Sequence, residues 1–538
     1  MGIYLDSKTA YALYRKEIRK PYFVDKTKML EELISVIREG GDNICITRPR
    51  RFGKTVAANM IAAFFSRACN STDLFSALEI GQTQGWEAYA NRYPVIHISF
   101  NDVMSPCRTY GEYIGQIEGR LLEDLRQSFP GLVGGQETSA VSALLNIYAA
   151  DDTAEFIFVL DEWDFIFHQS FAAEQEKREY LQFLRNLLKD RPYVLLTYMT
   201  GILPIAKYSS GSELNMFSEF TMAAEERFSD YFGFTDGEVD LLFERYQEKN
   251  GQAAKITRGG LKSWYDGYQT KGGERLYNPR SVVMALTNNN LGNYWTSSGP
   301  YDEIFYYIEH NVDQVREDLA LMVSGIPVPV KIREYAATMQ ELKTREEIFS
   351  AMVVYGFLSY ENGTVSIPNR ELMDKFAEML TREPSMGYVY RLAKASDRML
   401  QATLAGDTET MEEILELAHD TEVPLLSYHH ETELTAIVNL VYLSARDTYR
   451  VEREDRAGKG YVDFIFYPET DRNADGIILE LKVDHTPEEA IRQIREKNYA
   501  LRFRQRLGER QRFSGRILAV GIGYNRKDKK HHCRVEVL

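Results

Sequence analysis

The sequence predicts an α/β protein with more than one domain, and three observations lead to this prediction. The chain has 538 residues, more than a single hydrophobic core usually serves. Apolar runs at 43–47, 94–100, 156–160 and 193–201 have the length and composition of buried strands, and several of them end at polar residues. A segment with helical spacing of apolar residues follows the first of these runs. We therefore expect a sheet of parallel strands accompanied by helices.

The overall composition is that of an ordinary soluble protein, with 44% hydrophobic and 27% charged residues. No apolar run is long enough to span a bilayer, and charged residues interrupt the first twenty positions. The four cysteines lie far apart, without the spacing of a zinc site or a disulfide framework. We expect a cytoplasmic protein with reduced thiols and no membrane contact, for which an oligomer is possible.

The net charge of −15 is unevenly distributed along the chain. Residues 491–538 hold 14 Lys+Arg against 4 Asp+Glu, which gives this tail a charge of +10 and leaves −25 for the rest. A basic region of this kind attracts phosphates. We expect any nucleic-acid partner to bind near the C-terminus, and the alternative is a basic face that only stays solvated.

A phosphate-binding loop is predicted where the strand 43–47 passes through the residues Arg-Pro-Arg-Arg-Phe-Gly-Lys-Thr, 48–55, into a helix. The backbone N–H groups of such a loop and the start of the helix bind phosphates, Lys54 adds a charge near the β- and γ-phosphates, and Thr55 can coordinate Mg²⁺. Arg48 stands where the usual pattern has Gly. The residues expected to bind ATP are Arg50, Arg51, Phe52, Gly53, Lys54, Thr55 and Val56.

Two carboxylates follow the apolar run 156–160, at the end of a strand where open α/β sheets bind ligands. Asp161 is placed to hold Mg²⁺ together with Thr55, and Glu162 to orient or deprotonate the attacking water. The alternative is an acidic helix cap without a catalytic role. Thr200, at the end of the run 193–201, is a candidate sensor of the γ-phosphate, or else it caps a turn.

Six segments of the chain together resemble the bacterial AAA-ATPase-like family. They are residues 22–27, the loop 48–55, the Leu-Asp-Glu-Trp-Asp run at 160–164, and segments 199–202, 264–268 and 277–279. The resemblance covers roughly the first 300 residues in order. It implies a P-loop ATPase in which the arginine-rich loop, Arg48 included, is a family trait, while Trp163 replaces a common Tyr.

Between the two ends of the chain, we expect lids over the ATPase. Thr235 and Glu238 have the spacing of a capping box, which predicts the start of a helical lid. Arg280 could reach a γ-phosphate or form a surface salt bridge. Helices followed by an Asn-Gly hairpin at 362–363 predict a winged-helix-like module. The expected domains are the ATPase at 1–235, the helical lid at 236–330, the winged-helix-like module at 331–385, a helical connector at 386–420 and a C-terminal domain at 421–538.

The C-terminal domain carries a second group of charged residues on predicted strands. Asp463 lies in the strand 460–468, and Glu480 and Lys482 lie in the strand 476–483. Because side chains alternate across a strand, Glu480 and Lys482 point to the same face. Charges beside a core strand are costly to bury unless they are paired or bind a metal. A salt bridge at the edge of a strand is the alternative.

This arrangement resembles the PD-(D/E)XK nuclease superfamily over about 110 residues, although the leading Pro is absent. The resemblance implies that Asp463 and Glu480 bind Mg²⁺ and that Lys482 activates water or steadies the phosphate. It further assigns Glu431, or Glu433 in another helix register, as the upstream acid, and Gln493 and Tyr499 as accessory residues. We expect an ATPase module that regulates a nuclease acting on nucleic acid. The alternatives are an ATP-dependent assembly switch with an inactive nuclease-like domain, and a winged-helix nucleic-acid motor.

Overall fold

The computed structural model describes residues 2–103, 105–205, 214–222, 226–295, 312–332, 342, 344–382, 384, 387–417, 431–452, 462–468, 473–497 and 514–538. The chain forms two compact units. Unit 1 comprises Met1–Ile304 and Val330–Glu371, and unit 2 comprises Phe305–Pro329 and Leu372–Leu538. The finer domain boundaries given above stay a prediction.

Unit 1 is built on a five-stranded sheet with the order β2-β3-β4-β1-β5. The strands are β1 (Asn43–Thr47), β2 (Val95–Ser99), β3 (Phe156–Asp161), β4 (Val194–Gly201) and β5 (Phe217–Thr221), and all four neighbouring pairs are parallel. β1, β3 and β4 are almost entirely buried, as continuous apolar runs predict. The predicted parallel α/β fold is confirmed. In register, Ser99 pairs with Asp161, and Asp161 with Thr200, so the polar ends of three strands meet at one edge of the sheet.

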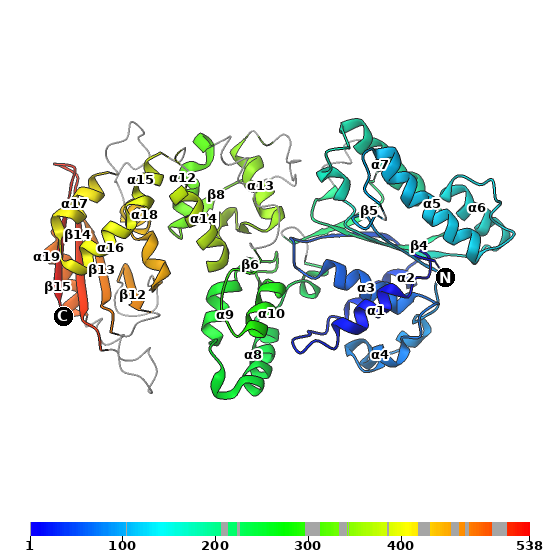
Figure 1. Cartoon of the computed structure of the whole chain (residues 1–538), viewed down its shortest axis with the longest axis horizontal. Helices are drawn as coiled ribbons and strands as arrows, with labels where there is room; N and C mark the ends of the chain where they lie inside the picture. The colour runs from blue at the N-terminus through cyan, green and yellow to red at the C-terminus, as the bar shows by residue number, and fades with distance from the viewer. Residues whose placement is uncertain are drawn as a thin grey trace. The chain divides into compact units, whose positions relative to one another are not determined.

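Helices cover both faces of this sheet (Figure 1). One face carries α1 (Thr9–Glu17), α2 (Met29–Arg38), α3 (Lys54–Phe65) and α4 (Thr72–Ser76), and the other carries α5 (Tyr110–Ser128), α6 (Ala140–Ala150) and α7 (Glu174–Leu188). Helix α3 is buried almost all round, because Ala58, Ile61 and Phe65 belong to a core that it shares with β1, β3 and β4. Such packing holds the start of α3, and with it the preceding loop, at a fixed place over the sheet.

The rest of unit 1 is helical with two short hairpins. Its elements are α8 (Asp236–Asn250), α9 (Arg258–Tyr265), β6 (Tyr268–Gln269), β7 (Arg275–Leu276), α10 (Pro279–Asn288), α13 (Arg345–Tyr355), β9 (Ser359–Glu361) and β10 (Thr364–Ser366). The predicted capping box is present, since Thr235 and Glu238 exchange hydrogen bonds at the start of α8. The predicted Asn-Gly hairpin joins β9 to β10, with Asn362 and Gly363 both at positive φ, as a tight hairpin turn requires.

Unit 2 contains a second sheet with the order β11-β12-β13-β14-β15, in which only β13 and β14 are parallel. The strands are β11 (Tyr449–Glu452), β12 (Phe464–Pro468), β13 (Gly476–Val483), β14 (Ile517–Asn525) and β15 (Lys530–Val537). Helix α19 (Pro487–Glu496) lies between β13 and β14 in the chain and packs Ile491 and Ile494 against Ile478. Since Ile478 shares a strand face with Glu480, α19 covers the face that carries the predicted charged residues.

The remaining elements of unit 2 are helical apart from one short strand. They are α12 (Val312–Val323), β8 (Val328–Pro329), α14 (Arg370–Arg382), whose first two residues belong to unit 1, α15 (Tyr388–Lys394), α16 (Ser396–Ala405), α17 (Thr408–Glu416) and α18 (Glu431–Val441). In the part of the chain that the structure describes, no helix combines the length and the apolar character that crossing a bilayer requires.

Candidate nucleotide site and C-terminal carboxylate site

The loop between β1 and α3 opens into a cleft of about 820 Å³. Gly53 has φ +92° and Arg51 has φ +73°, and the positive φ explains why the position before the helix is glycine. The N-cap residue Gly53 has no side chain with which to cap α3, and the N–H groups in the first turn of a helix have no partner within the helix, so they can bind an anion. Eight of the predicted residues line this cleft, namely Arg50, Arg51, Phe52, Gly53, Lys54, Thr55, Val56 and Glu162.

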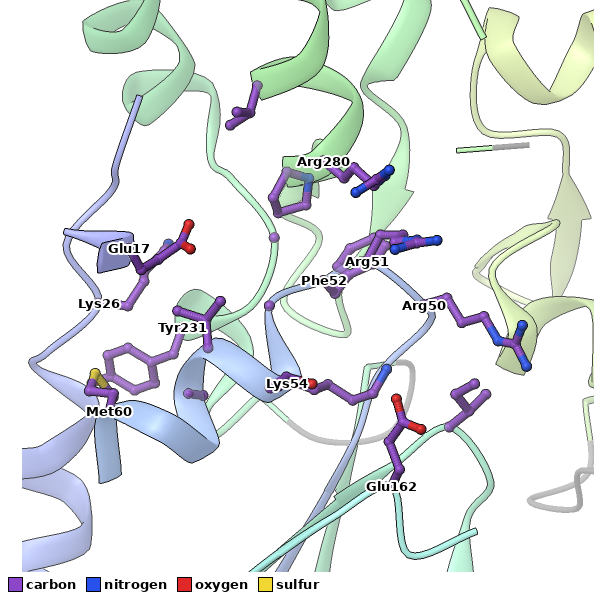
Figure 2. A pocket seen from close by; sticks show the side chains of 18 of the residues that line it. Glu17, Lys26, Arg50, Arg51, Phe52, Lys54, Met60, Glu162, Tyr231 and Arg280 are labelled. Carbon is purple, nitrogen blue, oxygen red and sulfur yellow. The ribbon is translucent and has the colours of Figure 1, made fainter. Parts of the chain in front are cut away.

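Lys54 is a buried cation at the centre of this site. Its ammonium donates hydrogen bonds to the carbonyls of Arg48 and Pro49, both at 2.9 Å, and points toward the Glu162 carboxylate (Figure 2). Burial lowers the pKa of Lys54 to about 8, against the opposing attraction of nearby carboxylates, chiefly Asp164. A polyanion bound at the loop would favour the charged form of this lysine.

Arg48, which replaces the Gly of the usual loop pattern, has a structural role. Its side chain is only 1% exposed, donates to the carbonyls of Thr47 and Phe220, both at 2.8 Å, and lies over the Phe232 ring. Burial lowers its pKa to about 10. Arg48 thus ties β1 to β5 beneath the loop, which a glycine could not do.

Asp161 and Glu162 lie at the end of β3, as predicted. Asp161 is buried and accepts hydrogen bonds from the backbone N–H of Glu162, at 3.0 Å, and from the Thr55 side chain. Burial raises the pKa of Asp161 to about 6. Because Thr55 and Asp161 meet here, their oxygens fit the ligand preference of Mg²⁺. Glu162 stands at φ +52° and lines the cleft, with its carboxylate near the Lys54 ammonium (Figure 2).

Thr200 is buried inside the sheet, whereas Arg280 lines the cleft. The Thr200 hydroxyl is fully buried and donates to the Ile46 carbonyl at 2.8 Å, inside the sheet. This bond joins β4 to β1 rather than capping the turn after β4, and the role of Thr200 as a γ-phosphate sensor stays a prediction. Arg280, on α10, lines the cleft on the same side of the loop as Arg51 (Figure 2).

Further residues of the cleft were not among the predicted site residues. Asp164, in the acidic run after β3, is buried and accepts from the N–H groups of Ile202 and Leu203 at 2.9 and 2.8 Å, which fixes the turn after β4. Asp164 belongs to the acidic run 161–164, and this position could have indicated that it lies at the site. Lys26 and Tyr231 line the other end of the cleft, and the Lys26 ammonium donates to the Asp230 carbonyl. Lys26 belongs to the segment 22–27 that supports the family resemblance, although it was not predicted to line the site, and no local pattern in the sequence marks Tyr231.

The C-terminal charged residues also come together. Asp463 directly precedes β12, and its carboxylate accepts from the backbone N–H of Leu481 at 2.7 Å. The Lys482 ammonium donates to Glu480 Oε1 at 2.9 Å, and the Gln493 side-chain amide, from α19, donates to the same oxygen. Four of the six predicted residues are therefore joined around the start of β12 and the end of β13.

Glu480 is a buried carboxylate with a raised pKa. It is 2% exposed, and burial, followed by the charge of Asp463, raises its pKa to about 7, although Lys482 and Lys497 act in the opposite direction. Its second oxygen, Oε2, is buried and has no hydrogen-bond partner within the described residues. An orphaned carboxylate oxygen beside a second carboxylate fits a hard cation such as Mg²⁺.

The other predicted members of the site are less fully described. Glu431 and Glu433 lie at the start of α18, but their side chains, like the whole of Tyr499, fall outside the described residues. Over the described ranges, no group of three or more His, Cys, Asp or Glu side chains is arranged to hold a metal. Of the predicted acids, the structure therefore describes the side chains of Asp463 and Glu480.

The basic tail is partly neutralised by its neighbours. Arg516 pairs with Asp475 at 2.5 Å, and Arg495 pairs with Glu536 at 2.6 Å. Arg526 also pairs with an acid, Asp484. Lys497, exposed after α19, is close enough to influence Glu480. Several described arginines of 491–538 are therefore engaged within the protein, which reduces the field that a nucleic acid would meet.

Two family models match the chain. Residues 13–210 match the family described as "Predicted AAA-ATPase", and residues 431–528 match the PD-(D/E)XK nuclease superfamily. The first match contains the cleft loop and the β3 carboxylates, and the second contains Asp463, Glu480, Lys482 and Gln493. The resemblance drawn from the sequence is thus confirmed for both domains.

A protein of Azotobacter chroococcum mcd 1, described as "Uncharacterized protein in vnfD 5'region", is 26% identical over 287 residues, which are 52% of this chain and 51% of that protein. The chain thus matches about half the length of this relative. Among solved structures, the Walker-type ATPase paby2304 of Pyrococcus abyssi is 12% identical, with a TM-score of 0.37 over 65% of this chain and 94% of that one. The Aeropyrum pernix ORC2 protein is 11% identical, with a TM-score of 0.32 over 67% and 98%. These scores add nothing to the fold assignment, which rests on the strand order and the family models.

Proposed function

Because the chain joins a predicted AAA-ATPase domain to a PD-(D/E)XK nuclease superfamily domain, we propose that it binds and hydrolyses ATP and that this module regulates a Mg²⁺-dependent nuclease acting on nucleic acid. The observation that carries the nuclease assignment is the buried Oε2 of Glu480, which has no hydrogen-bond partner among the residues that the structure describes and lies next to Asp463 and Lys482. A protein has little reason to bury such an oxygen without a partner unless a ligand completes the site.

In unit 1, the residues of the loop bind and orient the triphosphate. The backbone N–H groups at the start of α3 and the Lys54 ammonium meet the phosphates, and the carbonyls of Arg48 and Pro49 hold that ammonium in place beforehand. Glu162 orients water and accepts its proton. Thr55 and Asp161 would hold Mg²⁺, which neutralises charge on the phosphates.

In unit 2, Asp463 and Glu480 would hold Mg²⁺, which lowers the pKa of a bound water and polarises the phosphate. Lys482 donates to Glu480 and keeps a positive charge beside the place where charge develops on the phosphate. Gln493 fixes the orientation of the Glu480 carboxylate through the shared oxygen Oε1. The exposed Lys497 supports binding of a polyanionic substrate close to these residues.

The test is incubation of the purified chain with plasmid, linear DNA and RNA, with and without ATP and Mg²⁺. We expect cleavage that requires Mg²⁺ and is lost in Asp463→Ala and Glu480→Ala. If both variants cleave as fast as the parent, another site or a contaminant is responsible and the assignment fails. The nucleic acid that is cleaved identifies the substrate class.

A second candidate is an ATP-dependent assembly switch whose C-terminal domain only binds a partner. One observation favours it, because Glu480 Oε1 already accepts from both Lys482 and Gln493, as in a site satisfied by protein donors alone. Titration with Mg²⁺ separates the two candidates. Binding that disappears in Asp463→Ala supports the nuclease, and no binding at millimolar Mg²⁺ supports the switch.

A further inference from the structure

A buried carboxylate outside the cleft connects two of its walls. Glu371, in the first turn of α14, is 1% exposed. Its Oε1 accepts from the backbone N–H groups of Tyr294 and Trp295, both at 2.5 Å, and its Oε2 accepts from the Ser281 hydroxyl at 2.8 Å. Hydrogen bonds to a charged group in a buried place are stronger than those between neutral groups. Glu371 therefore fixes both the segment before residue 296 and the start of α10.

The first of these connections leads to the phosphate loop. Trp295 is 4% exposed, and its indole N–H donates to the Arg50 carbonyl at 3.2 Å. The indole ring packs edge to face on Phe357, with ring centres 5.3 Å apart. Next to it, Gly356 approaches the loop so closely that a Cβ atom there would lie 2.6 Å from the Pro49 ring. Trp295 and Gly356, which lie outside the sheet, thus contact the beginning of the loop at Pro49 and Arg50.

The second connection leads to the opposite wall. Asn278 caps α10 by accepting from the N–H of Ser281 at 3.2 Å, and Ser281 bonds to Glu371 through its hydroxyl. The neighbouring Arg280 and, one turn on, Val283 line the cleft. One carboxylate consequently holds the loop wall through Trp295 and the α10 wall through Ser281. Neither Glu371 nor Trp295 lines the cleft itself.

We propose that Glu371 and Trp295 are positioning residues for the ATP site, so that Glu371 orients Trp295 and Trp295 holds the Arg50 end of the loop. This inference rests on the proposed ATP binding in unit 1. Its physical basis is that loop N–H groups bind phosphates only when the backbone is held in the required geometry.

The test is a double-mutant cycle on ATP affinity in the full chain. Trp295→Phe keeps an aromatic ring but removes the N–H donor, and we expect ATP to bind about 5-fold more weakly. Glu371→Gln keeps the shape and removes the charge, and we expect a loss of about 10-fold. If Glu371 acts through Trp295, adding Trp295→Phe to Glu371→Gln weakens binding by less than about 2-fold more.

Trp264→Phe is the matched control, since it makes the same chemical change beside Arg370 at the start of α14. It should leave ATP affinity unchanged, and melting temperatures verify that every variant is folded. Parent-like affinity in both Trp295→Phe and Glu371→Gln, or losses that simply multiply in the double variant, would overturn the positioning role. A parent that binds no ATP would instead refute the proposed function, so the two failures are distinguishable.

Discussion

Replacing Glu480 by Gln should stabilise the protein at high pH in the absence of metal. Burial raises the pKa of Glu480 from its ordinary 4.5 to about 7. An acid whose pKa is raised by folding contributes its full stability below pH 4.5 and loses it as the pH rises through 7. From the difference between the two pKa values, ionisation of Glu480 lowers the unfolding free energy by about 3 kcal/mol at pH 8 and by under about 1 kcal/mol at pH 5. Gln has no charge to bury and should not show this loss.

The measurement is denaturant unfolding of the parent and Glu480→Gln at pH 5 and pH 8, in EDTA. The unfolding free energy of the variant minus that of the parent should be about 2 to 3 kcal/mol larger at pH 8 than at pH 5. The difference should appear in the unfolding transition of unit 2. Glu496→Gln, on the exposed side of α19, is the control and should stay within about 0.5 kcal/mol of the parent at both. An equal variant-to-parent difference at pH 5 and pH 8 would refute the reasoning about burial of Glu480.

Three more predictions concern unit 1. Glu162→Gln should keep ATP binding and slow hydrolysis by about 10² to 10⁴, measured by phosphate release, and a parent-like rate would remove Glu162 from catalysis. Thr200→Val loses the bond to Ile46 and should cost about 1 kcal/mol of stability while hydrolysis changes by less than about 3-fold, whereas a much larger fall in rate would support a phosphate sensor. Arg48→Ala should lower the unfolding free energy by about 3 kcal/mol in denaturant melts, and unchanged stability would show that Arg48 does not tie β1 to β5.

Much of the fold was predictable because its signals are local. The strands β1, β3 and β4 are short apolar runs, and the Thr235 capping box and the Asn362-Gly363 turn act within four residues. The sheet also contains β5, which the sequence did not predict. Its residues, Phe-Ser-Glu-Phe-Thr at 217–221, are only partly buried, so they lack the apolar run by which the other strands of this sheet were found.

The two sites were predictable to different depths. Strand alternation places Glu480 beside Lys482, and the structure joins them at 2.9 Å. The burial of Glu480 Oε2 without a hydrogen-bond partner among the described residues, by contrast, depends on the packing of α19 on the sheet. Likewise, Trp295 contacts the phosphate loop from 245 residues away in the sequence, and Glu371 contacts Trp295 from 76 residues away. No periodicity or motif in the sequence indicates either contact. The sequence thus predicted the residues of local motifs, but it did not predict the contacts with distant segments that hold these residues in place.

The coupling of the two sites is the central claim, and nuclease output in Lys54→Ala tests it most directly. This variant removes the buried ammonium at the loop and should abolish ATP hydrolysis, while Asp463 and Glu480 stay intact. Mg²⁺-dependent cleavage of nucleic acid is measured for the parent and for Lys54→Ala over a range of ATP concentrations. We predict that cleavage by the parent changes with ATP and that cleavage by Lys54→Ala does not. Cleavage that responds to ATP equally in both proteins, or in neither, would contradict regulation of the nuclease by the ATPase module.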